Sequence, residues 1–254
     1  MSRNTGGKKS GFGYSIRMFL LLAELLAAAL FLWGNDVYSL SATTPEFKWE
    51  NYKTIEHALG GIGDITYLNS KESFLSSYQM GCRLFEVDLT RTSDGVWVCR
   101  HSWNQSLGQW EGDEKNVLSS QEFLCRPIYG KYTPMTFEDL LVLLSDYPDA
   151  FVMLDSKQYS VRNYQKTLED YADYMELAQD AGVPEVMGQI IPEIYNQAMF
   201  AGTALLYNFP GYIYSLWQEY STDDLTEIAA FCKEKNIPFW SIKEEGDSIE
   251  LPSF

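Results

Sequence analysis

The sequence predicts an α/β fold, a TIM (β/α)₈-type barrel that is incomplete at its C-terminal end. From residue 54 onward, nearly continuous apolar strands alternate with helices, a pattern typical of a parallel sheet covered by helices. No Gly-x-Gly-x-x-Gly fingerprint follows the first strand, which disfavours the alternative, an open doubly wound sheet. Seven strands are predicted, whereas a closed barrel needs eight. We therefore expect residues 54–254 to form the barrel domain.

The first half of this domain is expected to contain one helix and three strands. Asn69 or Ser70 can cap the helix, and Gly81 can end it. Two runs of apolar and β-branched residues around a Ser-Asp-Gly turn are typical of a strand, a tight turn and a second strand. The expected order is a strand near 54–60, a helix to Gly81, a strand at 82–89, a turn at 93–95 and a strand at 96–101.

The second half alternates helices and strands more regularly. The run Thr136-Phe137-Glu138-Asp139 has a capping-box pattern, and Pro148 stops the helix that it opens. Residues 204–207 are ambiguous, and they would supply an eighth strand if they formed one. The expected order is that helix, a strand at 150–156, a helix to Gly182, strands at 187–194 and 211–217, a helix from about 221 to 236 and a strand at 237–243.

The N-terminal region has the pattern of a membrane or export signal. Residues 1–17 hold four basic side chains and no acid, and residues 18–34 form an apolar run interrupted by Glu24. This run is at the short end of a spanning helix, roughly 17–25 residues. The basic flank predicts a cytoplasmic tail, a single-pass anchor in the cell membrane and an extracytoplasmic domain. Residues 35–53 are polar and irregular, which is typical of a linker. A cleaved signal peptide and a secreted protein are the alternative.

The charge of the domain excludes nucleic acid as a partner. Four of the 19 basic and one of the 35 acidic residues lie at positions 1–34, so residues 35–254 carry 15 basic and 34 acidic side chains, a net charge of −19. Such a surface repels polyanions at long range. A phosphate-bearing substrate would need a local cation, which favours a bound metal over a basic patch.

Acidic side chains stand at the ends of two predicted strands. Side chains alternate along a strand, so Glu86 and Asp88 share a face and are expected to point into the barrel mouth. The alternative is a pair of surface carboxylates on an edge strand. Asp155 and Lys157 likewise share a face, where Asp155 could complete an oxygen-ligand set and Lys157 could bind a phosphate oxygen. The alternative for this pair is a buried salt bridge.

The chain contains two histidines, and each ends a predicted strand. His57 precedes two glycines, which allow the backbone to approach a ligand closely. His101 ends the strand beside Glu86 and Asp88. Two imidazoles around two carboxylates are suited to metal-assisted acid/base chemistry, although a single histidine at a strand end is more often structural.

The chain resembles the glycerophosphodiester phosphodiesterase family, within the wider group shared with phosphatidylinositol-specific phospholipase C. The resemblance runs from about residue 53 to 243 and is strongest in Glu86-Val87-Asp88, Thr92-Ser93-Asp94-Gly95 and His101. It implies a divalent cation, Mg²⁺ or Ca²⁺, bound by Glu86, Asp88 and Asp155. It also implies that His57 and His101 are the catalytic acid and base, in an order that the sequence does not assign.

Three departures from the family pattern bear on function. Ala58 stands where the family has an arginine that helps to hold phosphate, Leu68 stands in place of a glutamate before Asn69-Ser70, and Trp103 follows where an aspartate is usual. Family members also continue through another helix and strand beyond 243, which agrees with an incomplete barrel. The expected activity is hydrolysis of a glycerophosphodiester. The alternatives are a weakly catalytic barrel that binds phosphoglycerol polymers or glycans, and a phospholipase acting on lipid head groups.

Overall fold

The computed structural model describes residues 46–108, 112–113, 115–158, 164–216, 225–240 and 249–250. All of them belong to one compact unit, Leu40–Phe254. No helix among these residues is both long and apolar enough to cross a membrane. The predicted tail at 1–17 and membrane segment at 18–34 lie outside the described residues, so both remain predictions.

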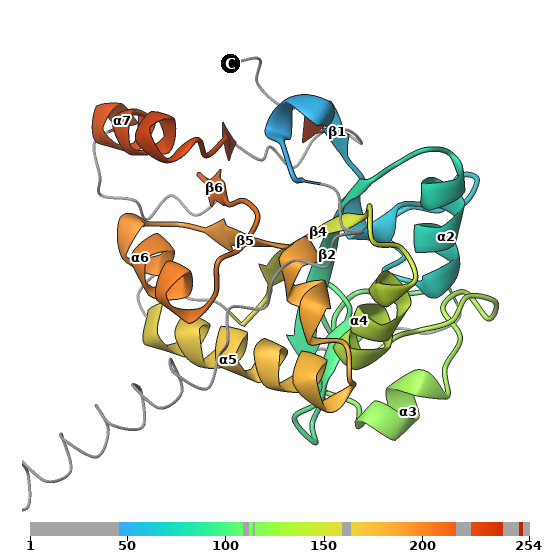
Figure 1. The fold of residues 1–254 in the computed structure, drawn as a ribbon. Coiled ribbons are helices and arrows are strands. Elements are labelled where there is room, and N and C mark those ends of the chain that lie inside the picture. The colour runs from blue at the N-terminus through green and yellow to red at the C-terminus, as the bar shows by residue number, and fades with distance from the viewer. Residues whose placement is uncertain are drawn as a thin grey trace, which may run out of the picture. The chain divides into compact units, whose positions relative to one another are not determined.

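Most of the strands form a mixed sheet with a parallel centre (Figure 1). The sheet has six strands in the order β3-β2-β4-β5-β6-β7, and only β3 runs antiparallel to its neighbour. Its strands are β2 (Leu84–Arg91), β3 (Trp97–Cys99), β4 (Phe151–Ser156), β5 (Ile190–Ile194), β6 (Ile213–Ser215) and β7 (Phe239–Trp240).

The first strand extends this parallel run by one bridge. Strand β1 (Thr54–Ile55) pairs antiparallel with β8 (Ile249–Glu250), and the next residue, Glu56, bridges in parallel to Phe85 on β2. The predicted α/β architecture is thereby confirmed. The described strands do not close into a barrel, because no ladder joins β7 to β1 and the parallel run is shorter than the eight strands that closure needs.

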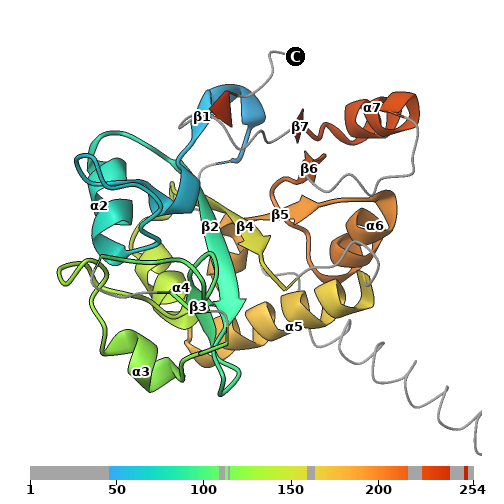
Figure 2. The same cartoon turned by 180° about the vertical axis from the view of Figure 1, so that it is seen from behind.

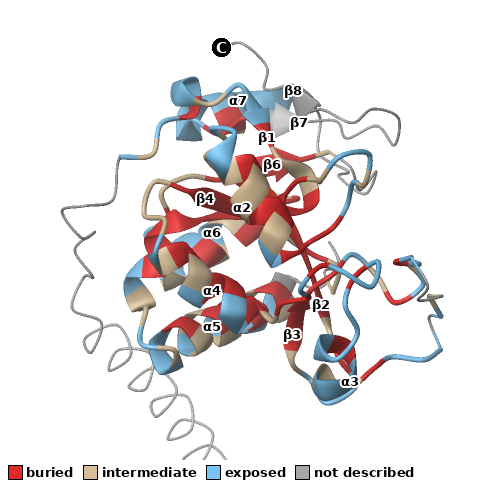
Figure 3. Ribbon diagram, turned by 90° about the vertical axis from the view of Figure 1, so that its right-hand side faces the viewer, coloured by how far each residue is buried: buried red, intermediate tan, exposed pale blue. Residues whose placement is uncertain are grey.

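The helices lie around the sheet (Figure 2). Helix α4 contacts α5, and α5 contacts α6. The outer sides of α4 and α5 are exposed, whereas β2 and β4 are buried (Figure 3). The α-helices are α2 (Lys71–Gln79), α3 (Ser120–Leu124), α4 (Phe137–Ser145), α5 (Tyr164–Asp180), α6 (Gln197–Leu206) and α7 (Leu225–Lys235), and the 3₁₀ turns are η1 (Trp49–Asn51), η2 (His57–Leu59) and η3 (Pro184–Gln189).

Strand alternation distributes the apolar side chains of β2 between two core clusters. Phe85, Val87 and Leu89 pack in the large cluster against the helices, whereas Leu84 belongs to a second cluster on the opposite face of the sheet. The second cluster fills the amino ends of the strands with apolar side chains from neighbouring strands, among them Phe151, Met153, Ile191 and Ile213. The predicted faces of β2 are confirmed. On the inner face, the apolar Leu84 lies toward the amino end of the strand, and the polar Glu86 and Asp88 follow it toward the carboxyl end.

Several element boundaries differ from the prediction for local reasons. The first strand stops at Ile55 because residues 57–59 turn away from the sheet as η2. The strand expected at 187–194 begins only at Ile190, since Pro184 opens the 3₁₀ turn η3 before it. Residues 204–206 are not a strand but the last turn of α6, whose N-terminus the Asn196 side chain caps.

The end of the predicted linker packs on the folded unit. Trp49 is buried, and the ring of Phe47 lies 4.8 Å from that of Phe151 and 5.3 Å from that of Tyr52. These aromatic side chains cover the apolar amino ends of the strands. Residues 46–53 are therefore part of the domain, because their aromatic side chains bury apolar area that a free linker would leave in water.

Gln189 is expected to be a fold-stabilising polar group. Its buried amide donates to the carbonyl oxygens of Leu144 at 3.3 Å, Tyr147 at 2.9 Å and Ala150 at 2.8 Å. Gln189→Leu should lower the free energy of unfolding in urea by about 1–3 kcal/mol, because buried acceptors lose their donor. The control is Gln179→Leu at an exposed position, which should change the free energy of unfolding by less than about 0.5 kcal/mol. Equal effects in the two variants would contradict this role.

Candidate active site and metal centre

Three carboxylates lie at the carboxyl end of the inner face of the sheet. Glu86 and Asp88 come from β2, and Asp155 comes from the neighbouring strand β4, where it is the register partner of Asp88. Glu86 and Asp88 are 1% and 0% exposed. This register sets Asp155 beside Asp88, and the near-complete burial of Glu86 and Asp88 contradicts the alternative of exposed surface carboxylates.

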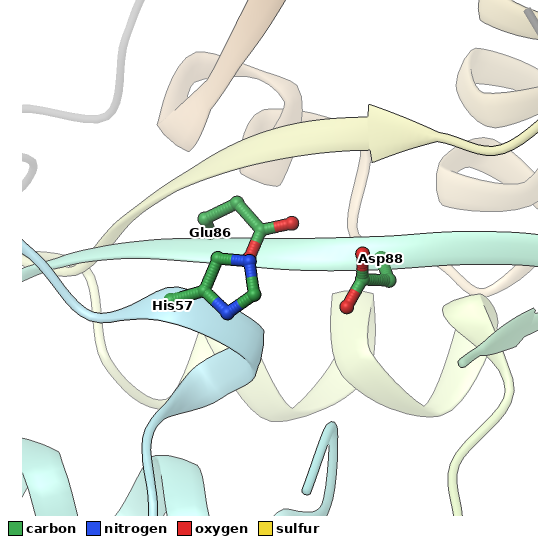
Figure 4. Close-up of side chains that lie close together, drawn as sticks. All are labelled: His57, Glu86 and Asp88. Atoms are coloured by element: carbon green, nitrogen blue, oxygen red, sulfur yellow. The ribbon is translucent and has the colours of Figure 1, made fainter. Parts of the chain in front are cut away.

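His57 reaches Glu86 from the turn η2 (Figure 4). Its Nε2 lies 3.6 Å from Oε2 of Glu86, and the backbone N–H of Ala58 donates to the same oxygen at 2.7 Å. Ligand atoms of His57, Glu86 and Asp88 all lie within 4.8 Å of one another. The tight turn needs Gly60, which has φ 92° and where a Cβ would stand 2.1 Å from Oγ of Ser77.

Asn69 holds Asp88 from the other side. Its side-chain amide donates to Oδ2 of Asp88 at 2.8 Å, and its Oδ1 accepts from the backbone N–H of Asp88 at 3.1 Å. Asn69 has φ 45°, a left-handed conformation that asparagine tolerates better than most residues. Ser70, rather than Asn69, caps α2. The sequence indicated Asn69 as a possible helix cap and as part of the family pattern, but its bond to Asp88 depends on the loop conformation.

Lys157 bridges the two strands. Its Nζ lies 2.8 Å from Oδ1 of Asp88 and 2.5 Å from Oδ2 of Asp155. The salt bridge considered as the alternative for Asp155 and Lys157 is therefore present, and it includes Asp88. Asp155 stands apart from the triad of His57, Glu86 and Asp88 in this arrangement, since its carboxylate is turned to Lys157.

The electrostatics of these carboxylates are unequal. Burial, followed by the charges of Asp88 and Asp155, raises the pKa of Glu86 well above its ordinary value. Burial alone would also raise the pKa of Asp88, but Lys157 and Asn69 lower it. Burial and then Asp88 outweigh Lys157 and raise the pKa of Asp155. The raised pKa values of Glu86 and Asp155 show that ionising both beside Asp88 is unfavourable, although Lys157 is present.

The donor set fits a hard divalent cation. Oε1 of Glu86 is buried and has no hydrogen-bond partner among the described residues. A buried carboxylate oxygen without a partner is costly, and a cation would satisfy it. Oxygen ligands from Glu86 and Asp88 are those that Mg²⁺ and Ca²⁺ prefer.

His101 is placed at the same end of the sheet by the hairpin. It follows β3, and the backbone N–H of Arg100 donates to the carbonyl oxygen of Asp88 at 2.8 Å. The side chain is exposed, with Nδ1 3.2 Å from Oγ of Ser102. His101 also lowers the pKa of Asp88 and Asp155, after the larger effects of burial and Lys157. His101 thus follows the strand that pairs with β2, and it is not part of the close group of His57, Glu86 and Asp88.

A fourth carboxylate, Glu193, was not predicted. It follows Pro192, the register partner of Leu154, so it lies level with Asp155 on the neighbouring strand β5. It is 2% exposed, and the hydroxyl of Tyr195 donates to its Oε2 at 2.8 Å. Burial and the charge of Asp155 raise its pKa to about 8. A single acid inside the apolar run Ile190–Ile194 was the sequence signal that could have identified it.

Comparison with known proteins supports the fold. The sequence matches no protein-family model and no curated protein. A Silicibacter pomeroyi protein assigned as a glycerophosphoryl diester phosphodiesterase has a similar structure, with a TM-score of 0.52 at 16% identity, covering 77% of this chain and 85% of that one. An Agrobacterium tumefaciens protein of the same assignment has a TM-score of 0.52 at 14% identity, covering 74% of each chain. The predicted resemblance to this family is therefore confirmed at the level of the fold.

Glu86→Gln is expected to stabilise the metal-free protein. The raised pKa means that the folded state binds the Glu86 proton more tightly than the unfolded state, so the ionised group costs stability at neutral pH and less as the pH falls. In EDTA, thermal unfolding of the variant at pH 7 should therefore occur at higher temperature. The control, Glu138→Gln on the exposed side of α4, should leave the Tm near that of the wild type. A variant less stable than the wild type in EDTA would contradict this reading.

Proposed function

We propose that this chain hydrolyses a phosphodiester, with a glycerophosphodiester as the expected substrate class. The observation that supports the proposal most directly is the position of His57 beside two buried carboxylates at the carboxyl ends of the strands. One of these carboxylates has an oxygen without a hydrogen-bond partner among the described residues. In barrels of parallel strands this end holds the active site. The similar structures from S. pomeroyi and A. tumefaciens are both assigned as glycerophosphoryl diester phosphodiesterases.

A divalent cation, Mg²⁺ or Ca²⁺, would be held by Glu86 and Asp88, with Asp155 as the third proposed ligand. When bound, the cation would neutralise the charge of the phosphate and polarise its phosphorus–oxygen bonds. His57 is the fourth candidate by proximity, since it lies near both β2 carboxylates. Hard cations prefer oxygen, however, which leaves the imidazole available for proton transfer.

The histidines would move the protons. Burial lowers the pKa of His57, which keeps the imidazole neutral and able to accept a proton near pH 7. The nucleophilic oxygen would bond to phosphorus as its proton passes to His57. The bond from phosphorus to the leaving alcohol would break as His101 donates a proton to that alcohol. His57 is therefore the proposed general base and His101 the general acid.

Lys157 is the proposed phosphate-binding side chain. Its ammonium has three N–H donors, and Asp88 and Asp155 account for two of them. The methyl side chain of Ala58 cannot donate a hydrogen bond to phosphate, and its backbone N–H already donates to Glu86. The phosphate would accordingly be held by the cation and Lys157 rather than by a group at position 58.

Loss of either histidine is expected to reduce turnover strongly. His57→Ala and His101→Ala should each lower kcat by about 10²–10⁴-fold while circular dichroism stays that of the wild type, because each removes one proton-transfer group. The assay would measure alcohol release from glycerophosphocholine, glycerophosphoethanolamine and glycerophosphoinositol, with and without EDTA. An activity that EDTA does not inhibit would refute the proposed cation. Normal turnover in His57→Ala or in His101→Ala would refute the proton-transfer role of the histidine that the variant lacks. Binding of glycerophosphodiesters without any turnover would instead favour the weakly catalytic binding barrel.

We also propose a membrane tether, on the pattern of the N-terminal sequence. A basic tail before an apolar run predicts an uncleaved anchor with the domain outside the cytoplasm. Fractionation of cells should recover the full-length chain in the membrane fraction, and a carbonate wash should not release it. A shorter, soluble mature form would show the alternative, a cleaved signal peptide.

A further inference from the structure

The orientation of His57 is not explained by hydrogen bonding alone. The distance of 3.6 Å from its Nε2 to Glu86 is too long for a firm hydrogen bond. That carboxylate oxygen already accepts a shorter bond from the Ala58 N–H. The imidazole is also 34% exposed, so core packing surrounds it only in part. A proton-transfer group needs a fixed direction, because small misplacements reduce its rate.

Tyr67 supplies the missing contact. Its ring packs edge-on against the imidazole of His57, with the ring centroids 4.8 Å apart and an interplanar angle of 80°. This T-shaped arrangement is a favoured geometry for aromatic pairs. Tyr67 is 42% exposed, so the ring stands beside the mouth instead of in the core.

The backbone holds Tyr67 in this position at a cost. Its φ of 58° is left-handed, a conformation that is unfavourable for a bulky aromatic residue. The segment is fixed at both sides, because Nε2 of Gln105 donates to the Tyr67 carbonyl at 3.4 Å and Asn69 N–H donates to the Ala58 carbonyl at 2.8 Å. Strained residues persist where the surroundings determine them, and they concentrate at functional sites.

We propose that Tyr67 is a positioning residue, which fixes the imidazole of His57 for proton transfer by edge-on ring packing. The role rests on the proposed hydrolysis and adds to it a residue that the sequence pattern did not indicate. The phenol hydroxyl has no part in it, so the ring alone should suffice. Removal of the ring should change kcat more than KM, since Tyr67 acts through His57 and not on the substrate.

Tyr129 provides a matched control. It is 41% exposed and has φ 53°, so it shares the exposure and the backbone conformation of Tyr67. Its described contacts are with Gly108, where a Cβ would stand 2.8 Å from its ring, and with the carbonyl of Leu107, rather than with His57. Asparagine at either position removes the ring and suits the left-handed backbone.

The test compares Tyr67→Asn, Tyr67→Phe and Tyr129→Asn in the full-length chain in detergent. With glycerophosphocholine, Tyr67→Asn should lower kcat about tenfold with KM within about twofold, at an unchanged or higher Tm. Tyr67→Phe and Tyr129→Asn should both retain wild-type kcat. A purely structural role for Tyr67 would lower Tm and kcat together, and that result would overturn the proposal.

A second measurement separates this inference from the proposed function. The chain has two histidines, so its imidazole NMR spectrum contains two sets of resonances, which His57→Ala assigns. Tyr67→Asn should shift the His57 resonances, and Tyr129→Asn should leave them unchanged. Unchanged His57 resonances, or wild-type kcat in Tyr67→Asn, would overturn the positioning role. An inactive wild type would refute the proposed hydrolysis, while the NMR result would still test the contact.

Discussion

The burial of Glu86 and Asp88 on the inner face of β2 is the constraint on which the rest of the site depends. Two carboxylates at alternate positions of one strand must point the same way, and here both are almost fully buried. Among the described residues, the groups that compensate them are one ammonium, one backbone N–H and one side-chain amide. The deficit of positive charge is the physical reason to expect a cation.

Two of the compensating groups come from residues with an unusual backbone conformation. The Ala58 N–H reaches Glu86 because η2 turns off the first strand, with Ala58 at φ 51° and Gly60 at φ 92°. Asn69 reaches Asp88 from a left-handed conformation, and Tyr67 shares that conformation two residues earlier. The segment from η2 to α2 thus supplies the imidazole of His57 and the ring of Tyr67 beside the two carboxylates of β2. Four of the left-handed residues other than glycine, Ala58, Leu59, Tyr67 and Asn69, lie in this one segment.

The regular part of this arrangement followed from the sequence. Alternation along 82–89 predicted the buried face of Glu86 and Asp88, and the capping box at Thr136 predicted the start of α4. The bond from Asn69 and the ring of Tyr67 could not be predicted, because both depend on left-handed loop residues that no periodicity encodes. Glu193 was missed since one acid does not interrupt an apolar strand pattern. The salt bridge of Lys157 was foreseen as an alternative, but its second partner depended on strand order.

The most direct test of the account is calorimetric titration of the EDTA-treated, full-length chain with Ca²⁺ and Mg²⁺ in detergent. One cation should bind per chain, and Asp88→Asn should abolish or greatly weaken that binding while the fold persists. The lack of a binding heat with both Ca²⁺ and Mg²⁺, in protein whose folding is verified by circular dichroism, would contradict the proposed cation site. So would unchanged affinity in Asp88→Asn, because the cation would then lie elsewhere and the buried carboxylates would need another explanation.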